Sequence, residues 1–527
     1  MYLNLDSADT CAEIRLNGTV LGQSDNMFAR FRAWTGHLLK AGKNTLEIEF
    51  ESVTAEANRR AGRSRESLGQ NDNNAIPNLQ FLRKIQSSGG WDWGICLPVC
   101  GLYDSLYLAE APARIEHLTV SQSFKGPDAV LTVQIEFNTY PRFGRAVPQC
   151  PAVSFLQSGI DAHSEKYNTD IPVWNSSPCK GPEDMGANVW NPSRGDLHYW
   201  DVWHGDKPFE AFYSVAPRFC AEFGFQSFPL LSTLRRWISP EHWNLSAPEI
   251  EAHQKNGIGN TRILSTFARY FRVPVGFEQT VYLSQVQQAL AMQTGVDHFR
   301  SLQPYCMGAL YWQLNDNWPV ASWSSIDYTG GWKILHYAAK RFFAPLRLTA
   351  VKRDGVFTVC LVNDTPGSIP GTLHLLFHSF RGKTENLLAE KLEIAGQSVV
   401  FPVQIPDCSD PENGFFELRF ETGTQVLRNE FFPVAYKRSA LPVPKIRTQI
   451  RKTASGFDVA LSAGQFAFFV FAGLRDTACR WSDNAVTLYP GEEVVLLAHP
   501  ETELSEEEFR KQLVVHDLGS TANPEIQ

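Results

Sequence analysis

Hydrophobic and polar positions alternate in the first and last parts of the chain, which predicts β-strands there. In residues 1–110, two alternating runs at 11–16 and 44–51 are separated by Asn-Gly and Gly-Lys-Asn turn sequences. A polar, arginine-rich segment at 55–78 predicts a solvated helix or loop. Further strand patterns occur at 358–362, 373–378, 416–420, 459–461, 466–471 and 493–497. We therefore expect one β-sandwich at the start of the chain and two at its end.

The middle of the chain has a different pattern. Between residues 171 and 345, short apolar runs are followed by helical stretches, and Leu283, Val286 and Leu290 recur at helical spacing within 283–302. Polar, aromatic-rich loops follow the apolar runs, as in a (β/α)8 barrel that carries its chemistry at the strand ends. A strand pattern after Ala113 stops near Phe137, and residues 138–165 show no clear period.

Composition excludes several classes of function. The 527 residues include 48 Lys and Arg against 56 Asp and Glu, a net charge of −8, so nucleic acid is not an expected partner. No apolar run is long enough to span a membrane, and no signal peptide is visible, so we expect a soluble chain, cytoplasmic if taken as written. Whether a full-length parent is secreted or lysosomal stays open. The 10 cysteines and 13 histidines show no metal-ligand spacing. We expect no cofactor.

One carboxylate stands out as candidate chemistry. Glu222 lies between apolar residues in the run Arg-Phe-Cys-Ala-Glu-Phe-Gly-Phe-Gln-Ser at 218–227, at an expected strand end. A carboxylate there is costly unless it is paired or used. By position alone, a structural ion pair is the competing interpretation.

The surrounding motifs resemble a known family. The segment at 218–227 is similar to the nucleophile segment of family 2 glycoside hydrolases of the β-mannosidase type. Gly-Trp-Asp-Trp-Gly at 90–94 resembles the loop that the jelly-roll domain of these enzymes sends into the sugar pocket. The strand ends at 175–178 and 195–200, the last barrel strand at 310–319 and the start of the closing helix at 332–337 also match, in family order.

The resemblance implies a retaining exo-glycosidase that removes terminal β-linked mannose from the non-reducing end of an oligosaccharide. Glu222 is then the nucleophile, and it must stay ionised. Asp92 is expected to accept hydrogen bonds from sugar hydroxyls, and Trp312 to offer an apolar face. The remaining residues expected to bind substrate are Trp91, Trp93, Trp203, Tyr213 and Asn315. The four aromatic residues of this set are expected to line the sugar pocket, and ordinary core packing is their competing role.

The expected acid/base glutamate is not found. In the family it follows an asparagine at an earlier strand end, whereas the Asn-Glu pair of this chain is Asn429-Glu430, in an expected sandwich. Asp161, Glu165 and Asp170 are the nearby carboxylates, and none is an evident replacement. We therefore expect an N-terminal truncation and an internal deletion near residues 138–168. A chain made this way should have little or no β-mannosidase activity, since general acid catalysis contributes about 10²–10⁴-fold.

The predicted fold is multidomain, β with α/β. The expected parts are a jelly roll that lacks its first strands at 1–112, a remnant of an immunoglobulin-like sandwich and the deletion junction at 113–165, the second half of a TIM barrel at 166–346, an immunoglobulin-like sandwich at 347–440 and a last sandwich at 441–527. Two other functions stay open: another family 2 specificity such as β-galactosidase or β-glucuronidase, and a non-catalytic carbohydrate-binding protein. The oligomeric state is open as well.

Overall fold

The computed structural model describes residues 1–70, 73–110, 113–125, 128–139, 176–181 and 190–523. It divides into two compact units, residues 1–175 and 176–527, and each is described by itself. The expected deletion junction falls almost wholly outside the described residues.

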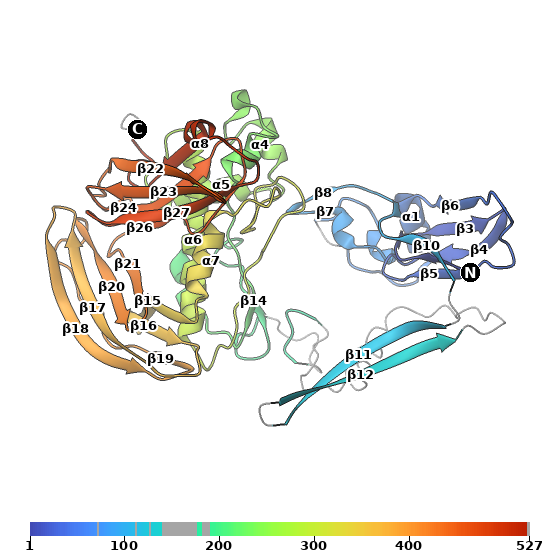
Figure 1. Ribbon diagram of the computed structural model, residues 1–527, viewed down its shortest axis with the longest axis horizontal. Helices are drawn as coiled ribbons and strands as arrows, with labels where there is room; N and C mark the ends of the chain where they lie inside the picture. The colour runs from blue at the N-terminus through green and yellow to red at the C-terminus, as the bar shows by residue number, and fades with distance from the viewer. Residues whose placement is uncertain (71–72, 111–112, 126–127, 140–175, 182–189, 524–527) are drawn as a thin grey trace. The chain divides into compact units, whose positions relative to one another are not determined.

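The described residues of the first unit form a β-structure with one α-helix, α1 (Figure 1). Its sheets have the strand orders β10-β1-β5, β4-β3-β6, β2-β9 and β7-β8. The elements are β1 (Tyr2–Leu5), β2 (Ala8–Asp9), β3 (Ala12–Leu16), β4 (Thr19–Ser24), β5 (Phe31–Trp34), β6 (Leu46–Phe50), α1 (Val53–Arg63), the 3-10 turns η1 (Leu79–Phe81) and η2 (Gln86–Ser88), β7 (Gly89–Trp91), β8 (Gly94–Cys96), β9 (Gly101–Leu102) and β10 (Leu106–Ala109). The strands predicted at 11–16 and 44–51 are confirmed as β3 and β6.

Alternation explains these strands. In β3, Ala12, Ile14 and Leu16 are buried and the residues between them are half-buried, so one face of the strand enters the core. The polar segment predicted as a helix or loop begins as helix α1, whose N-cap Ser52 accepts a hydrogen bond from the amide of Ala55. A long antiparallel hairpin of β11 (Ala113–Lys125) and β12 (Asp128–Thr139) follows the sheets.

The second unit begins with a mixed helical and parallel-strand region. Its elements are β13 (Leu197–His198), η3 (Phe209–Ser214), β14 (Cys220–Glu222), α3 (Leu231–Leu234), η4 (Pro240–His242), α4 (Pro248–Ala252), α5 (Gly259–Tyr270), α6 (Phe277–Ser301) and α7 (Ile334–Phe342). Strands β13 and β14 pair in parallel, as an α/β region requires. The helix predicted at 283–302 is confirmed as part of α6, with Leu283 and Val286 fully buried.

Helix α6 supports the segment that follows β14, and its buried glutamines do so by hydrogen bonds. The side-chain amide of Gln288 donates to the carbonyl of Phe225 (2.9 Å), and that of Gln285 donates to the carbonyl of Phe228 (3.1 Å). The amide of Phe228 in turn donates to the hydroxyl of Ser284 (3.1 Å). Because buried polar groups need such partners, these bonds fix the path of the chain leaving β14.

Two β-sandwiches complete the second unit (Figure 1). The first joins the sheets β15-β16-β19 and β18-β17-β20-β21, and the second joins β22-β23-β27-β25 and β26-β24-β28. Their elements are β15 (Leu346–Arg353), β16 (Val356–Asn363), β17 (Ile369–Ser379), β18 (Thr384–Ile394), β19 (Ser398–Val400), β20 (Gly414–Thr422), β21 (Val426–Phe431), β22 (Ile446–Thr453), β23 (Gly456–Ala463), β24 (Ala467–Leu474), β25 (Cys479–Trp481), β26 (Val486–Leu488), β27 (Glu493–Pro500), α8 (Glu506–Gln512) and β28 (Leu513–His516). All six strands predicted in this part of the chain are confirmed.

Candidate active site

The ends of two parallel strands, β13 and β14, and a segment bridged to β14 carry the candidate site. Next to the parallel pair β13 and β14, the amide of Tyr199 donates to the carbonyl of Glu222 (2.7 Å). On the other side of β14, Cys220 forms a parallel bridge with Ala309, and the amide of Leu310 donates to the carbonyl of Cys220 (2.8 Å). Because parallel strands place their carboxyl ends at one edge, residues that follow each strand come together there.

Glu222 ends β14, and a histidine from β13 contacts it. The Nδ1 atom of His198 lies 3.2 Å from Oε2 of Glu222. The Nε2 atom of the same ring lies 2.8 Å from the hydroxyl of Ser177, which donates to Oδ2 of Asp196 (2.5 Å). The amide of Cys179 donates to the other oxygen of Asp196 (2.5 Å). Glu222 keeps 28% of its side-chain surface exposed, so a substrate can reach its carboxylate.

A buried lysine lies behind this row of side chains. Lys180 is buried, and its Nζ donates to the carbonyl of Asp196 (2.7 Å). Burial lowers the pKa of Lys180, and the carboxylate of Asp196 opposes that shift. Burial also lowers the pKa of His198, with Asp196 opposing and Lys180 adding to the shift. The motif at 195–200, which was matched to a strand end, contains Asp196 and His198, whereas Lys180 lies outside the matched motifs. Sequence reasoning assigned none of these three residues a role.

Two glycines let the strand ends approach closely. At Gly195, with φ +65°, a Cβ would lie 1.9 Å from the carbonyl oxygen of Cys179. At Gly224, a Cβ would lie 2.5 Å from the carbonyl oxygen of Trp312 and 2.7 Å from Cδ1 of Trp323. Only glycine avoids both contacts, which explains the glycines of the motifs at 195–200 and 222–227.

Trp312, predicted to face the sugar, lies in the segment that follows the bridge between Ala309 and β14. Its amide donates to the carbonyl of Phe223 (2.9 Å), and its side chain is half-buried. The structure therefore brings the segment of Trp312 beside the end of β14, which carries Glu222. That arrangement is the one in which an apolar ring can flank a sugar attacked by a carboxylate.

Asn315 is exposed, whereas the next residue, Asp316, is a buried carboxylate. Asp316 is buried and accepts hydrogen bonds from the hydroxyls of Ser322 and Ser324, each at 2.6 Å. Burial raises the pKa of Asp316 to about 6, although nearby Lys333 opposes the shift. Burial lowers the pKa of Lys333 to about 8. This buried pair supports the loop after Trp312. Asp316 lies within the motif at 310–319, but sequence reasoning assigned it no role.

Two aromatic residues predicted as pocket walls pack elsewhere. Trp203 is fully buried, with its ring 4.9 Å from that of Phe225 and 5.8 Å from that of Trp323. The structure thus places Trp203 in the core, where no ring surface is left for a sugar. Tyr213 lies in η3, and its ring contacts those of His298 (5.4 Å) and Phe357 (6.1 Å). Tyr213 therefore packs against the first of the two C-terminal sandwiches.

The Trp-Asp-Trp motif forms the tip of a hairpin in the first unit. Trp91 pairs with Gly94 across β7 and β8, so Asp92 and Trp93 are its two-residue turn. The rings of Trp91 and Trp93 lie 6.3 Å apart, and all three side chains are half-buried. The hairpin thus presents two indole rings and a carboxylate together. Their role in substrate binding stays a prediction.

The Asn-Glu pair of the chain lies in a sandwich, as expected. Asn429 and Glu430 belong to β21, and the hydroxyl of Tyr489 donates to Oε1 of Glu430 (3.1 Å). Burial raises the pKa of Glu430. Asp161, Glu165 and Asp170 lie outside the described residues.

The described parts of the chain contain neither of two further features. No three or more His, Cys, Asp or Glu side chains among the described residues form a group that could hold a metal ion. Within those same ranges, no helix is both long enough and apolar enough to cross a membrane.

Comparison with known proteins identifies the relatives of this chain. The family model described as "Glycosyl hydrolase 2 galactose-binding domain-like" matches residues 1–104, and one described as "Ig-fold domain" matches residues 441–521. The β-mannosidase of Rattus norvegicus is 29% identical over 383 residues, which cover 66% of this chain and 43% of that protein. The chain is a homologue of the β-mannosidases of glycoside hydrolase family 2. β-Mannosidase B of Emericella nidulans is 28% identical over 337 residues, or 59% of this chain and 40% of that protein.

The homologous segments span less than half the length of these curated β-mannosidases. Among solved structures, the β-D-mannosidase of Dictyoglomus thermophilum is 21% identical with a TM-score of 0.83, covering 98% of this chain and 90% of that chain. An exo-chitosanase of Amycolatopsis orientalis is 12% identical with a TM-score of 0.63, covering 98% and 89%. These structures share the fold of the chain, which, together with the matches to the two domain models, confirms the predicted fold class.

Proposed function

We propose that this chain carries the nucleophile of a retaining β-mannosidase, and that the nucleophile is Glu222. The position of Glu222 supports the proposal most directly. Glu222 ends a parallel strand, it is partly exposed, and the segment of Trp312 lies beside the end of that strand. The homology to β-mannosidases points to terminal, non-reducing β-D-mannose as the sugar.

The reaction would proceed by two displacements at the anomeric carbon. A carboxylate oxygen of Glu222 attacks C1, and the bond from C1 to the leaving oxygen breaks with its electron pair on that oxygen. A second nucleophile then attacks C1 from the opposite face and releases Glu222 as a carboxylate. Two inversions give net retention. Asp92, Trp91, Trp93 and Asn315 are proposed to bind the sugar.

The chain lacks an evident acid/base residue, and this sets which substrates it should cleave. An alkoxide leaving group needs a proton as it departs, and a general acid contributes about 10²–10⁴-fold to that step. A dinitrophenolate leaving group is stable without a proton. We therefore infer that the chain alone attacks activated mannosides and barely hydrolyses natural β-mannosides.

The test uses 2,4-dinitrophenyl β-D-mannoside with and without sodium azide. Release of dinitrophenolate reports the first displacement, and azide can complete the second without a general base. We expect azide to raise turnover at least tenfold and to yield β-mannosyl azide, identified by NMR. Glu222→Gln should abolish both signals, whereas the exposed Glu241→Gln should leave them unchanged.

Other outcomes separate the alternatives. Hydrolysis of an unactivated β-mannoside that Glu222→Gln abolishes would show that a working acid/base exists and contradict the inferred deficit. Faster reaction with the matching β-galactoside or β-glucuronide would contradict the mannose assignment. Mannose binding by calorimetry without any dinitrophenolate release would identify a carbohydrate-binding protein instead of an enzyme.

A further inference from the structure

The imidazole of His198 uses both ring nitrogens to join two carboxylates. Nδ1 lies 3.2 Å from Oε2 of Glu222, and Nε2 lies 2.8 Å from the hydroxyl of Ser177. Ser177 lies 2.5 Å from Oδ2 of Asp196. The four side chains therefore form one row of three contacts, from Glu222 through His198 and Ser177 to Asp196. We call this row the Glu222–Asp196 relay.

Counting protons shows what the contact between His198 and Glu222 requires. The two hydrogen bonds of the relay need two protons, one on the hydroxyl of Ser177 and one on Nε2 of His198. A neutral His198 of this kind turns the lone pair of Nδ1 toward the carboxylate of Glu222, 3.2 Å away. The contact is an ion pair only if His198 binds a third proton at Nδ1.

His198 is the site for that third proton. Its ordinary pKa of 6.5 exceeds the ordinary values of carboxylates. Both oxygens of Asp196 already accept hydrogen bonds, one from the amide of Cys179 and one from the hydroxyl of Ser177. With an imidazolium, Nδ1 forms an ion pair with Glu222, Nε2 donates to Ser177, and Ser177 donates to Asp196.

We propose that His198 is a positioning residue, which in its imidazolium form orients the Glu222 carboxylate for attack through the Glu222–Asp196 relay. This inference rests on the proposed role of Glu222 as nucleophile. His198 approaches Glu222 from the neighbouring strand, and the side chain of Glu222 is 28% exposed. As the glycosyl ester hydrolyses, the same imidazolium stabilises the departing carboxylate.

The relay makes the nucleophile sensitive to pH. Among the described residues, the charged groups that face His198 are Glu222 from β14, Asp196 two residues before it on the chain, and Lys180 from the 176–181 segment. Burial lowers the pKa of His198, and Asp196 counteracts this. As the pH rises through that pKa, the third proton leaves, and the ion pair between His198 and Glu222 is lost. We expect attack by Glu222 to slow over the same pH range.

The first experiment measures the pKa of His198 in the absence of substrate. The Cε1–H signal of His198, assigned with His198→Gln in ¹³C-histidine-labelled protein, is titrated by NMR. We expect Glu222→Gln and Ser177→Ala each to lower the pKa of His198, the former by about 1 unit or more, because a nearby carboxylate favours the imidazolium. An unchanged pKa of His198 in both variants would overturn the proposal.

The chain offers a matched control for this titration. The hydroxyl of Ser325 lies 3.1 Å from Nδ1 of His336, a serine–histidine contact outside the relay. Ser325→Ala should alter the titration of His336 and leave that of His198 unchanged. Ser177→Ala should do the reverse. A shift of both histidines in both variants would indicate a general structural effect and overturn the relay.

The second experiment measures attack by Glu222. The probe is 2,4-dinitrophenyl 2-deoxy-2-fluoro-β-D-mannoside, which leaves a stable sugar on the nucleophile that intact-mass spectrometry detects. We expect Ser177→Ala to lower the rate constant of labelling about three- to tenfold and change its pH profile, with the probe's binding constant within twofold. Unchanged labelling and an unchanged pH profile in Ser177→Ala would refute the positioning role.

The two experiments distinguish a failure of the relay from a failure of the proposed function. A coupled titration without labelling of the wild type would leave the relay intact and contradict Glu222 as the nucleophile. Labelling of Glu222 with an uncoupled His198 would support the proposed function and contradict the relay.

Discussion

A buried ion pair fastens helix α6 to the first C-terminal sandwich, and removing it should be costly. The guanidinium of Arg347 in β15 donates twice to Asp297 in α6, at 2.9 and 2.7 Å, and the hydroxyl of Thr349 donates to the same carboxylate at 2.7 Å. The side chains of Arg347 and Asp297 are only 9% and 4% exposed. Arg347→Met would leave the Asp297 carboxylate buried with Thr349 as its partner, at a cost of about 3–5 kcal/mol.

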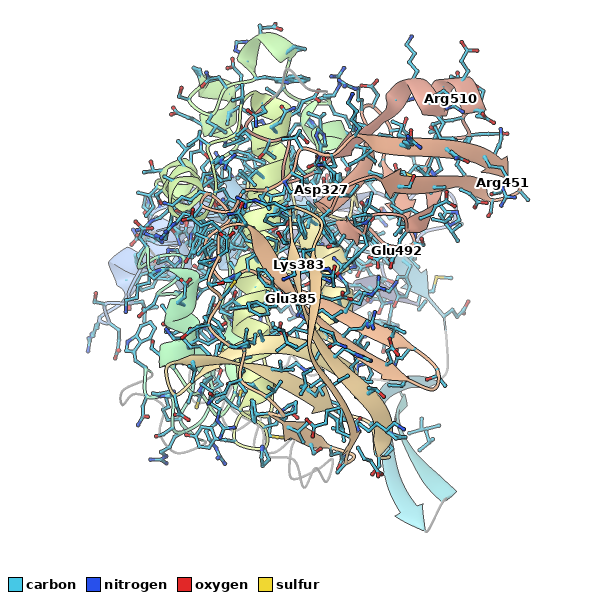
Figure 2. The ribbon with its side chains drawn as sticks, turned by 90° about the vertical axis from the view of Figure 1, so that its left-hand side faces the viewer. Asp327, Lys383, Glu385, Arg451, Glu492 and Arg510 are labelled. Atoms are coloured by element: carbon cyan, nitrogen blue, oxygen red, sulfur yellow. The ribbon has the colours of Figure 1, made fainter. Side chains whose placement is uncertain are left out.

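An exposed pair provides the control. Arg510 and Glu506 lie one turn apart on α8, with side chains 55% and 47% exposed, and Arg510 lies on the outer surface of the last sandwich (Figure 2). Such a pair contributes about 0.3–0.5 kcal/mol, so Arg510→Ala should have little effect. The double variant Asp297→Leu with Arg347→Met removes both buried charges, and we expect it to recover more than half of the loss.

Hydrogen exchange with mass spectrometry is the suitable assay, because a chain with several domains need not unfold in one step. Amides of β15 should exchange about 10²-fold faster in Arg347→Met, since 1.4 kcal/mol corresponds to a factor of ten. The free energies of unfolding measured in urea should rank the variants in the same order. The reasoning would be refuted if Arg347→Met changed β15 exchange less than about fivefold, or if the double variant were as unstable as the single one.

Two further predictions concern the site and the pH dependence of stability. Gly224→Ala places a Cβ against the carbonyl of Trp312 and should slow labelling by the fluorinated probe at least tenfold, whereas Gly423→Ala, which has nothing within 4 Å, should not change it. Burial lowers the pKa of His516 from its ordinary 6.5 to about 4, so between these values the unfolded state binds a proton that the folded state does not. Lowering the pH from 6.5 to 4 should therefore remove about 3 kcal/mol of unfolding free energy. His516→Phe, whose ring can still stack on Tyr282, should remove that decline, and an equal decline in the variant would contradict this account.

Local pattern was enough to predict most of the elements. Short apolar or alternating runs predicted β16, β17, β20 and β27. In β17 and β27 one face of the strand is more buried than the other, whereas most residues of β16 and β20 are buried on both faces. Helical spacing predicted α6. It did not reveal that α6 carries buried glutamines, since Gln285 and Gln288 look like a solvated face until their carbonyl partners are known.

The motifs were a reliable guide to the family and a weaker guide to individual roles. Glu222 and Trp312 were predicted for the site, and the segment of Trp312 does lie beside the strand end that carries Glu222. Trp203 was predicted as a wall residue, but an aromatic side chain after a strand can turn toward the core as easily as toward the pocket. Its packing against Phe225 and Trp323 decided that orientation.

By itself, the sequence determined the order of the β and α/β regions, the resemblance to β-mannosidases and the choice of Glu222, because periodicity and motifs are local properties of the chain. Only the tertiary structure decided that Ser177, Asp196, His198 and Glu222 meet in one row. These residues are brought together by parallel pairing of β13 with β14 and by the bend at Gly195. A shared proton depends on distances of about 3 Å between side chains, and sequence spacing does not encode those distances.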